Sequence, residues 1–307
     1  MKKYTAIFII ACLFAGTLLQ AQTRIRVNNT PGVDADYSDL QEAITNAGEG
    51  DIIYIESSGI PYNGSYHVDE PYMTLIGPGY FLSMNDSTQA NKSPVKIENL
   101  YVDETATGTT IMGLMIDEMY VDAGNVNITR NHIYRVNVCH SSSATDLNLY
   151  CNYITYMVYV YDGKISSGGI YNNIFKTNQR AISSGENSSL NIYNNVFDVY
   201  YGGTVLDVRN ANIKNNIIYN SFYSYEPFID ANPANGNNVA YNVICQPELT
   251  QFPNNVWDVA IEDVIVYTTG GSEKKYILPD GSPAIGAGEN GVDCVIFGTN
   301  TPYVFSG

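Results

Sequence analysis

Tyrosine is the residue type in this sequence with the clearest potential for ligand chemistry. The chain holds 26 Tyr, against 10 Phe and 1 Trp. A tyrosine side chain offers an apolar ring that can stack on a sugar and a hydroxyl that can hydrogen bond to it. Tyr is also a common strand residue whose hydroxyl reaches water, so a purely structural role is the alternative. Among the crowded tyrosines, we expect ligand binding at Tyr156, Tyr159, Tyr161, Tyr200 and Tyr201.

The other side chains that could bind a metal or carry out chemistry form no recognisable site. The acidic pairs Asp103-Glu104, Asp117-Glu118 and Glu262-Asp263 could hold calcium, but such pairs are more typical of solvated turns. The three His are not clustered, and no spacing of Cys or His indicates a metal site. We therefore predict no metal site and no cofactor, with calcium left open without a specific motif, and we name no catalytic residue.

The charge of the chain excludes several classes of partner. Fifteen Lys and Arg stand against 31 Asp and Glu, which gives a net charge of −16. Such a surface repels the phosphate backbone of nucleic acids and the headgroups of anionic membranes. We expect no nucleic-acid partner and leave the oligomeric state open.

The first 21 residues resemble a secretory signal peptide. A basic start at residues 1–3 precedes an uncharged, mostly apolar run from Tyr4 to Leu19, and Ala21 offers a small residue for cleavage. Sixteen residues are short for a membrane span, and no later stretch is long enough, so we expect no transmembrane segment in the mature chain. The protein is then secreted, periplasmic or on the cell surface. Its mature charge is 13 − 31 = −18.

Four cysteines remain after cleavage near Ala21. They are Cys139, Cys151, Cys245 and Cys294. Four cysteines allow three pairings, between which the sequence does not choose. We favour buried, unpaired core residues.

The middle of the chain repeats an aliphatic-x-x-Asn-x-apolar pattern. The repeated Asn are Asn131, Asn152, Asn173, Asn195, Asn216 and Asn242, spaced by 21, 21, 22, 21 and 26 residues. A fixed period in this range indicates a solenoid. The flanking apolar positions predict two stacks, one running from Ile128 to Val239 and the other from Ile133 to Ile244.

Two solenoids fit this period. A leucine-rich repeat needs many Leu, but residues 123–245 contain only four. Ile, Val, Tyr, Phe and Thr fill the repeats instead, and these residues favour strands. We therefore predict an all-β fold, a single-stranded right-handed parallel β-helix with a short N-terminal capping helix, having about three short strands in each coil.

The repeated Asn has a structural role in this prediction. Asn tolerates the left-handed backbone of a sharp turn, and amides stacked in register can hydrogen bond from coil to coil as an Asn ladder. We treat the six Asn as structural.

The two ends of the chain read as caps of a single domain over residues 22–307. Residues 38–47 have a helical pattern with a capping box from Ser38 to Gln41, and Leu40, Ala43, Ile44 and Ala47 on one face. The N-terminal cap is expected over about 24–56, the regular Asn-ladder coils over 123–245, and irregular closing coils over 246–307.

These elements together resemble the pectin-lyase-like superfamily. The residues that carry the resemblance are the strand at Val27, the helix from Leu40, Gly50-Asp-Ile-Ile-Tyr-Ile55, Leu75-Ile-Gly-Pro-Gly-Tyr80, the Asn-centred coils and Gly281 to Gly288. More narrowly, the chain looks like the secreted right-handed β-helix repeat proteins, uncharacterised in function, of Gram-negative bacteria. The resemblance implies the fold over roughly residues 24–307 and implies no activity by itself.

Many relatives in that superfamily cleave acidic polysaccharides, which gives a direct comparison. Polygalacturonase-like enzymes carry Asn-Thr-Asp, Asp-Asp, Gly-His-Gly and Arg-Ile-Lys, none of which occurs here. The Trp-x-Asp-His pattern of pectate-lyase-like enzymes is also missing. Coils of 21–22 residues leave little room for the long loops that wall a catalytic cleft. We expect non-catalytic binding of a polysaccharide or surface glycan, or a structural role; the alternative is a lyase or glycoside hydrolase acting on an acidic polysaccharide.

Overall fold

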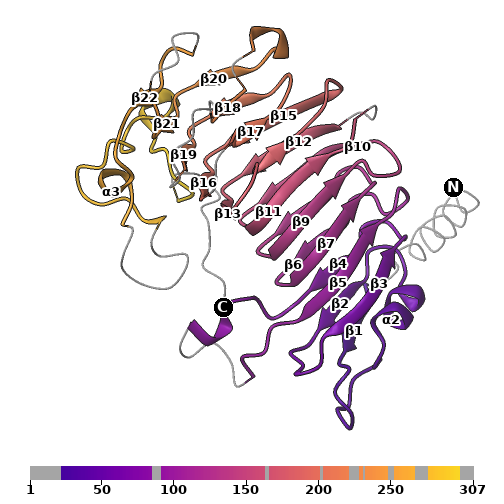
Figure 1. Ribbon diagram of the computed structural model, residues 1–307. Coiled ribbons are helices and arrows are strands. Elements are labelled where there is room, and N and C mark those ends of the chain that lie inside the picture. The colour runs from indigo at the N-terminus through magenta and orange to yellow at the C-terminus, as the bar shows by residue number, and fades with distance from the viewer. Residues whose placement is uncertain are drawn as a thin grey trace, which may run out of the picture.

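The protein is described from a computed structural model covering residues 22–84, 91–162, 166–200, 203–220, 228–230, 232–247, 252–266 and 276–297. Its strands stack from the N-terminal end to the C-terminal end as successive coils of a solenoid (Figure 1). The expected signal peptide, residues 1–21, lies outside these ranges. No helix within them is long and apolar enough to cross a bilayer.

Every coil contributes to two parallel sheets. Sheet A contains β1 (Arg24–Val27), β2 (Ile52–Ile55), β4 (Thr74–Ile76), β6 (Thr110–Met112), β8 (Asn127–Thr129), β10 (Ala144–Tyr150), β12 (Ser166–Tyr171), β15 (Ser188–Tyr193), β18 (Asn212–Lys214) and β20 (Asn238–Ala240). Sheet B contains β3 (Tyr62–Val68), β5 (Lys96–Val102), β7 (Met115–Val121), β9 (His132–Val138), β11 (Tyr153–Val160), β13 (Ile174–Thr177), β14 (Ile182–Ser183), β16 (Val196–Val199), β17 (Leu206–Asp207), β19 (Ile217–Asn220), β21 (Val243–Ile244) and β22 (Val256–Trp257). A leucine-rich repeat has one strand per coil, so the second sheet rules it out. The predicted all-β parallel β-helix is confirmed.

Both predicted apolar stacks are present in the core. Ile128, Leu149 and Ile170 face one another on neighbouring strands of sheet A, and the row continues to Val239. The second row runs through sheet B from Ile133 to Ile244. All residues of both rows are at most 3% exposed, because alternating positions of a strand point inward.

Sheet B changes along the molecule. The N-terminal coils have one long strand in this sheet, such as β7 and β9. From β11 onward the strand divides, because β11 pairs with both β13 and β14, and β17 then follows β14. The prediction of three short strands per coil therefore holds only for the later coils.

The Asn ladder occupies the turn from sheet A to sheet B. In each coil the backbone N–H and Nδ2 of the ladder Asn donate to Oδ1 of the next ladder Asn, as from Asn173 to Asn195 at 3.0 Å for both bonds. Nδ2 also donates to a carbonyl of the preceding coil, as from Asn195 to Ile170 at 2.8 Å. All six Asn are fully buried, and Asn255, which the sequence analysis missed, adds a seventh rung.

The left-handed residue of this turn is not the ladder Asn. Positive φ occurs one residue earlier, for example at Asn172 (55°), Asn194 (55°) and Cys151 (57°). The expected link between the ladder and the left-handed backbone was therefore wrong. The ladder residue needs an amide side chain, whereas the residue before it needs tolerance of positive φ, and an Asn-Asn pair supplies both.

The N-terminal end is closed by helix α2 (Leu40–Asn46), which lies beside β1 and β3 (Figure 1). The helix begins at Leu40, as predicted, but its N-cap is Asp39 rather than Ser38, and Asp39 accepts from Glu42 N at 2.8 Å. Gln41 instead bonds to the backbone of His67 at 2.8 and 3.2 Å, which covers part of the edge of β3. Leu40, Ala43 and Ile44 are buried, as predicted.

The described part of residues 246–307 has two roles. β22 adds a strand to the end of sheet B. The chain then passes through the short helix α3 (Ile261–Val264), and residues up to Phe297 pack against the outside of the solenoid. Three 3-10 turns, Leu82–Met84, Pro233–Asn235 and Glu289–Gly291, complete the elements described.

This C-terminal segment covers an apolar strip on the outer face of sheet B. Ile174, Val196, Ile217 and Val243 point outward in register but are completely buried, in a cluster with Tyr276 and Ile296. The Tyr276 hydroxyl donates to the buried Asp198 carboxylate at 2.9 Å, and Lys176 pairs with the same carboxylate at 2.7 Å. Burial and the Asp198 charge raise the pKa of Tyr276 well above 10, so the hydroxyl stays a donor. Cys139, Cys151, Cys245 and Cys294 form no disulfide with one another.

Candidate functional site

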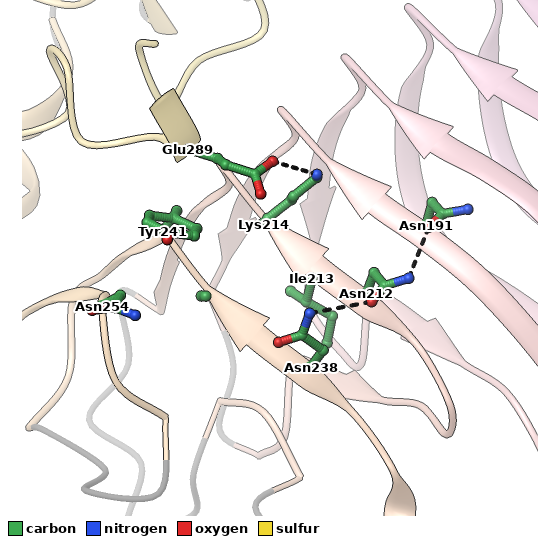
Figure 2. A pocket seen from close by; sticks show the side chains of 9 residues that line it. Asn191, Asn212, Ile213, Lys214, Asn238, Tyr241, Asn254 and Glu289 are labelled. Atoms are coloured by element: carbon green, nitrogen blue, oxygen red, sulfur yellow. Dashed lines mark hydrogen bonds and ion pairs between the residues drawn. The ribbon is translucent and has the colours of Figure 1, made fainter. Parts of the chain in front are cut away.

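The outer face of sheet A carries a second row of asparagines. Asn127, Asn148, Gly169, Asn191, Asn212 and Asn238 occupy one register position on neighbouring strands. In the C-terminal half of the row the amides are linked side by side: Asn238 donates to Asn212 at 3.3 Å and Asn212 donates to Asn191 at 3.0 Å (Figure 2). Asn191, Asn212 and Asn238 are exposed, so each amide keeps hydrogen-bonding capacity for a ligand.

A row of tyrosines runs parallel to the asparagines, two residues further along each strand. Tyr150, Tyr171 and Tyr193 stack ring on ring, with centroids 5.1 and 4.9 Å apart and planes within 6° of parallel. Lys214 takes the next position in this row. Because neighbouring rings cover each other's faces, the row offers mainly ring edges and hydroxyls. Stacking of a sugar on an exposed ring face, as the sequence suggested, is not what this row provides.

Burial sets the ionisation of these tyrosines. It raises the pKa of Tyr171 to about 12, with smaller contributions from Tyr193 and Tyr150 beside it. The pKa of Tyr193 is raised for the same reason. Both hydroxyls therefore stay protonated and can donate hydrogen bonds across the physiological pH range.

The two rows form the floor of a groove with two adjoining hollows. The larger has a volume of 530 Å³ and lies over Gly168 and Gly169, between Asn148 and Asn191, with Asp146 at its side. The smaller has a volume of 360 Å³ and lies over Asn212 and Asn238. Asn191 and Lys214 line both hollows, so the two are continuous parts of one groove.

A salt bridge forms part of the wall of the smaller hollow. Lys214 Nζ lies 2.5 Å from Glu289 Oε2, and Glu289 comes from the C-terminal segment (Figure 2). The Glu289 backbone N–H donates to Asn215 Oδ1 at 2.8 Å, which fixes the segment there. Residues 75 positions apart thus meet at the groove. Sequence reasoning could not find Glu289, because only the folded-back segment places it there.

The tyrosines selected from the sequence lie elsewhere. Tyr156 is on sheet B, stacked on Tyr134 at 4.8 Å under the Arg135 guanidinium. Tyr159 and Tyr161 contact each other edge to face at 4.7 Å. Tyr200 is 46% exposed, with Lys176 Nζ 5.2 Å from its ring, and Tyr201 lies outside the described residues.

The structure therefore does not bring the described members of this set, Tyr156, Tyr159, Tyr161 and Tyr200, into the groove. Tyr171 and Tyr193 in the groove precede an Asn-Asn pair in two successive repeats, Ile-Tyr-Asn-Asn. Aligning the repeats by register, rather than counting tyrosines, would have placed both residues in one outward row. That is the signal which the sequence analysis did not use.

A further hollow of 460 Å³ lies at the N-terminal end of the same face. Its lining is largely apolar, with Tyr54, Ile76 and Pro78. The Arg26 guanidinium at this site is already paired with Glu56 at 2.6 Å. We therefore base the candidate site on the groove, where exposed amides and tyrosine hydroxyls converge.

Neither the described metal-binding residue types nor a comparison with known proteins identifies a ligand for the groove. Within the described ranges, no group of three or more His, Cys, Asp or Glu side chains is placed to hold a metal ion. Comparison of the sequence with protein-family models and with curated proteins finds no match. The chemistry of the groove therefore has to be inferred from its own residues.

Proposed function

We propose that this protein binds a polysaccharide or surface glycan along the outer face of sheet A without cleaving it. The observation that carries the proposal is the exposed asparagine row running beside a tyrosine row in one continuous groove. Amides both donate and accept hydrogen bonds, and so they can pair with sugar hydroxyls, which also do both. Neighbouring strands lie about 4.8 Å apart, similar to the length of one sugar ring, so the same groups recur in step with a glycan chain.

The resemblance to secreted pectin-lyase-like β-helix proteins supports the same proposal. A signal peptide over residues 1–21 would deliver the protein to the periplasm, the cell surface or the medium, where glycans are the abundant polymers. The parallel sheets and buried Asn are consistent with that superfamily, whose fold carries both enzymes and non-catalytic proteins.

The placement of the carboxylates in the groove supports binding over hydrolysis by a pair of carboxylates. A glycosidase needs two carboxylates across the scissile bond. Here the Glu289 carboxylate is engaged by Lys214, and Asp146 lines the other hollow. The two carboxylates line different hollows, so no described pair flanks one position in the groove.

A glycan array combined with product sizing tests the proposal. The purified protein should bind one or more immobilised polysaccharides, and Asn191→Ala should reduce that binding several-fold. Polymer length should stay unchanged after prolonged incubation, with and without calcium. Absence of binding across a broad array would overturn the proposal; shortened chains would replace it with the lyase or hydrolase alternative, which the new end groups would distinguish.

A further inference from the structure

The outer asparagine row is interrupted at Gly169, between Asn148 and Asn191. Resting on the function proposed above, we infer that this gap is the principal subsite of the groove and seats one uncharged sugar residue. Gly169 is then the residue that determines affinity and the position of the glycan along the groove.

The neighbouring Gly168 shows why Gly169 stands out. Gly168 has φ of +142°, and a Cβ there would lie 2.1 Å from the Leu147 carbonyl oxygen, so the backbone itself requires glycine. Gly169 has no left-handed backbone, but a Cβ there would lie 3.0 Å from Cδ1 and 3.1 Å from Cε1 of Tyr171, so the ring would have to shift by a few tenths of an ångström. The backbone therefore requires the first glycine, whereas at the second glycine a longer side chain would both press on the Tyr171 ring and project into the hollow that Gly169 lines.

The groups around that space suit a polyhydroxyl ligand. Amides of Asn148 and Asn191 flank it in the same row, and the edges of Tyr171 and Tyr193 lie beside it. The hollow of 530 Å³ falls within the range of about 300–1,000 Å³ that small-molecule sites occupy. The hollow therefore has room for the sugar ring seated at the gap and for parts of the adjoining sugars of the same glycan chain.

The charges of the groove favour an uncharged sugar over a uronate. Asp146 contributes a carboxylate to the larger hollow, and Glu289 contributes one to the smaller. Among the residues that the structure describes, Lys214 is the only cation lining either hollow, and its charge is balanced by Glu289. A uronate would thus meet like charge at one side and no unbalanced cation, which disfavours binding.

Substitution of the glycine tests the subsite directly. Gly169→Asn would complete the amide row but fill the gap, and Thr110→Asn, in the same row three strands away on β6, is the matched control. The probes are linear oligosaccharides of glucose, mannose, xylose and N-acetylglucosamine, with oligogalacturonate as the charged probe. Affinities come from calorimetric titration. Melting temperatures show whether each variant folds. If Gly169→Asn does not fold, Gly169→Ser takes its place.

We expect the protein to bind at least one uncharged oligosaccharide more tightly than oligogalacturonate. Gly169→Asn should weaken that binding at least tenfold, and Thr110→Asn should change it by less than twofold. Equal affinity of the Gly169 variant and the unmodified protein would overturn the subsite while leaving glycan binding intact. Tighter binding of oligogalacturonate would overturn the assignment to an uncharged sugar. Failure of the unmodified protein to bind any probe, by contrast, would reject the proposed function and the subsite with it.

Discussion

The two asparagine rows of this protein use the same residue type at the same coil-to-coil spacing and have opposite surroundings. The inner row, from Asn131 to Asn255, lies in the turn between the sheets, where its first six residues are completely buried. In the outer row, Asn191, Asn212 and Asn238 lie on sheet A and are exposed. An inner Asn such as Asn195 donates three side-chain hydrogen bonds and accepts two. Asn212 donates one and accepts one.

The burial of a repeated residue separates structural from ligand-binding positions in a solenoid. A buried amide must satisfy all its hydrogen bonds inside the protein, because water is absent there. An exposed amide can leave part of its capacity to a ligand at little cost. The repeat period alone does not distinguish the two rows; burial does.

The largest expected effect is loss of an inner rung. Asn195→Ala would remove the bonds that Nδ2 donates to the Ile170 and Tyr193 carbonyls, of which the Tyr193 carbonyl keeps a bond from a backbone N–H. It would also leave the Asn173 backbone N–H without its acceptor inside the core. Buried polar groups that lose their partners cost about 1–3 kcal/mol each, so we expect a loss of about 3 kcal/mol in the free energy of unfolding. Urea denaturation measures it. A loss below 1 kcal/mol would show that the inner ladder contributes no more than a surface row.

The same contrast between buried and exposed positions applies to histidine. Burial lowers the pKa of His132, which packs against Tyr80, Phe81 and Tyr153, to about 4, with a smaller effect from Lys96. Below pH 6.5 the unfolded chain binds a proton at this residue, whereas the folded chain binds it only near pH 4. Stability should therefore fall as the pH drops from 6.5 to 4, by up to about 3 kcal/mol.

The variant His132→Phe isolates this contribution. It should lose less stability than the unmodified protein between pH 6.5 and pH 4, as measured by urea unfolding at each pH. Tyr134→Phe, at an exposed position on the same strand β9, keeps its ring and is the control, with a loss of stability that should match that of the unmodified protein. Parallel curves for the unmodified protein and His132→Phe would contradict the burial argument.

A smaller effect is expected where the C-terminal segment covers sheet B. Tyr276→Phe removes the hydroxyl that donates to the Asp198 carboxylate at 2.9 Å but keeps the buried ring. We expect a loss of about 1.5–3 kcal/mol in the free energy of unfolding, the range for a hydrogen bond to a charged group. Thermal unfolding monitored by circular dichroism gives the change. An unchanged melting temperature would mean that the segment is held by its apolar contacts alone.

The smallest change in stability is expected in the outer row. Asn212→Ala removes one bond to Asn191 and one from Asn238, all three at exposed positions. Its free energy of unfolding should stay within about 0.5 kcal/mol of the original. A drop as large as that of Asn195→Ala would erase the distinction between the rows.

Much of the fold could be predicted from the sequence, because the repeat fixes it locally. The spacing of the six Asn and the apolar residues around them gave the sheets, the two core stacks and the ladder positions. The N-cap of the helix was placed one residue early, at Ser38, since Ser38 and Asp39 are both good N-caps and only the folded chain selects between them. The division of β11 into two later strands has no local signal.

The candidate site was less predictable, for two physical reasons. Tyr156, Tyr159 and Tyr161 were chosen by crowding, yet alternation along β11 and a register shift between Ile154 and Met157 decide which face each occupies. Glu289 reaches the groove only because residues 276–297 fold back along the solenoid. Contacts between distant segments of this kind are not encoded in any repeat.

Affinity electrophoresis of the purified protein beside the double variant Asn191→Ala/Asn212→Ala tests the central claim most directly. Gels containing each of a panel of uncharged polysaccharides report binding as retarded migration, and a gel without polysaccharide provides the reference. The account predicts retardation of the unmodified protein in at least one gel, and loss of that retardation in the double variant at an unchanged melting temperature. Equal retardation of both proteins would contradict the claim that the outer asparagine row is the binding surface.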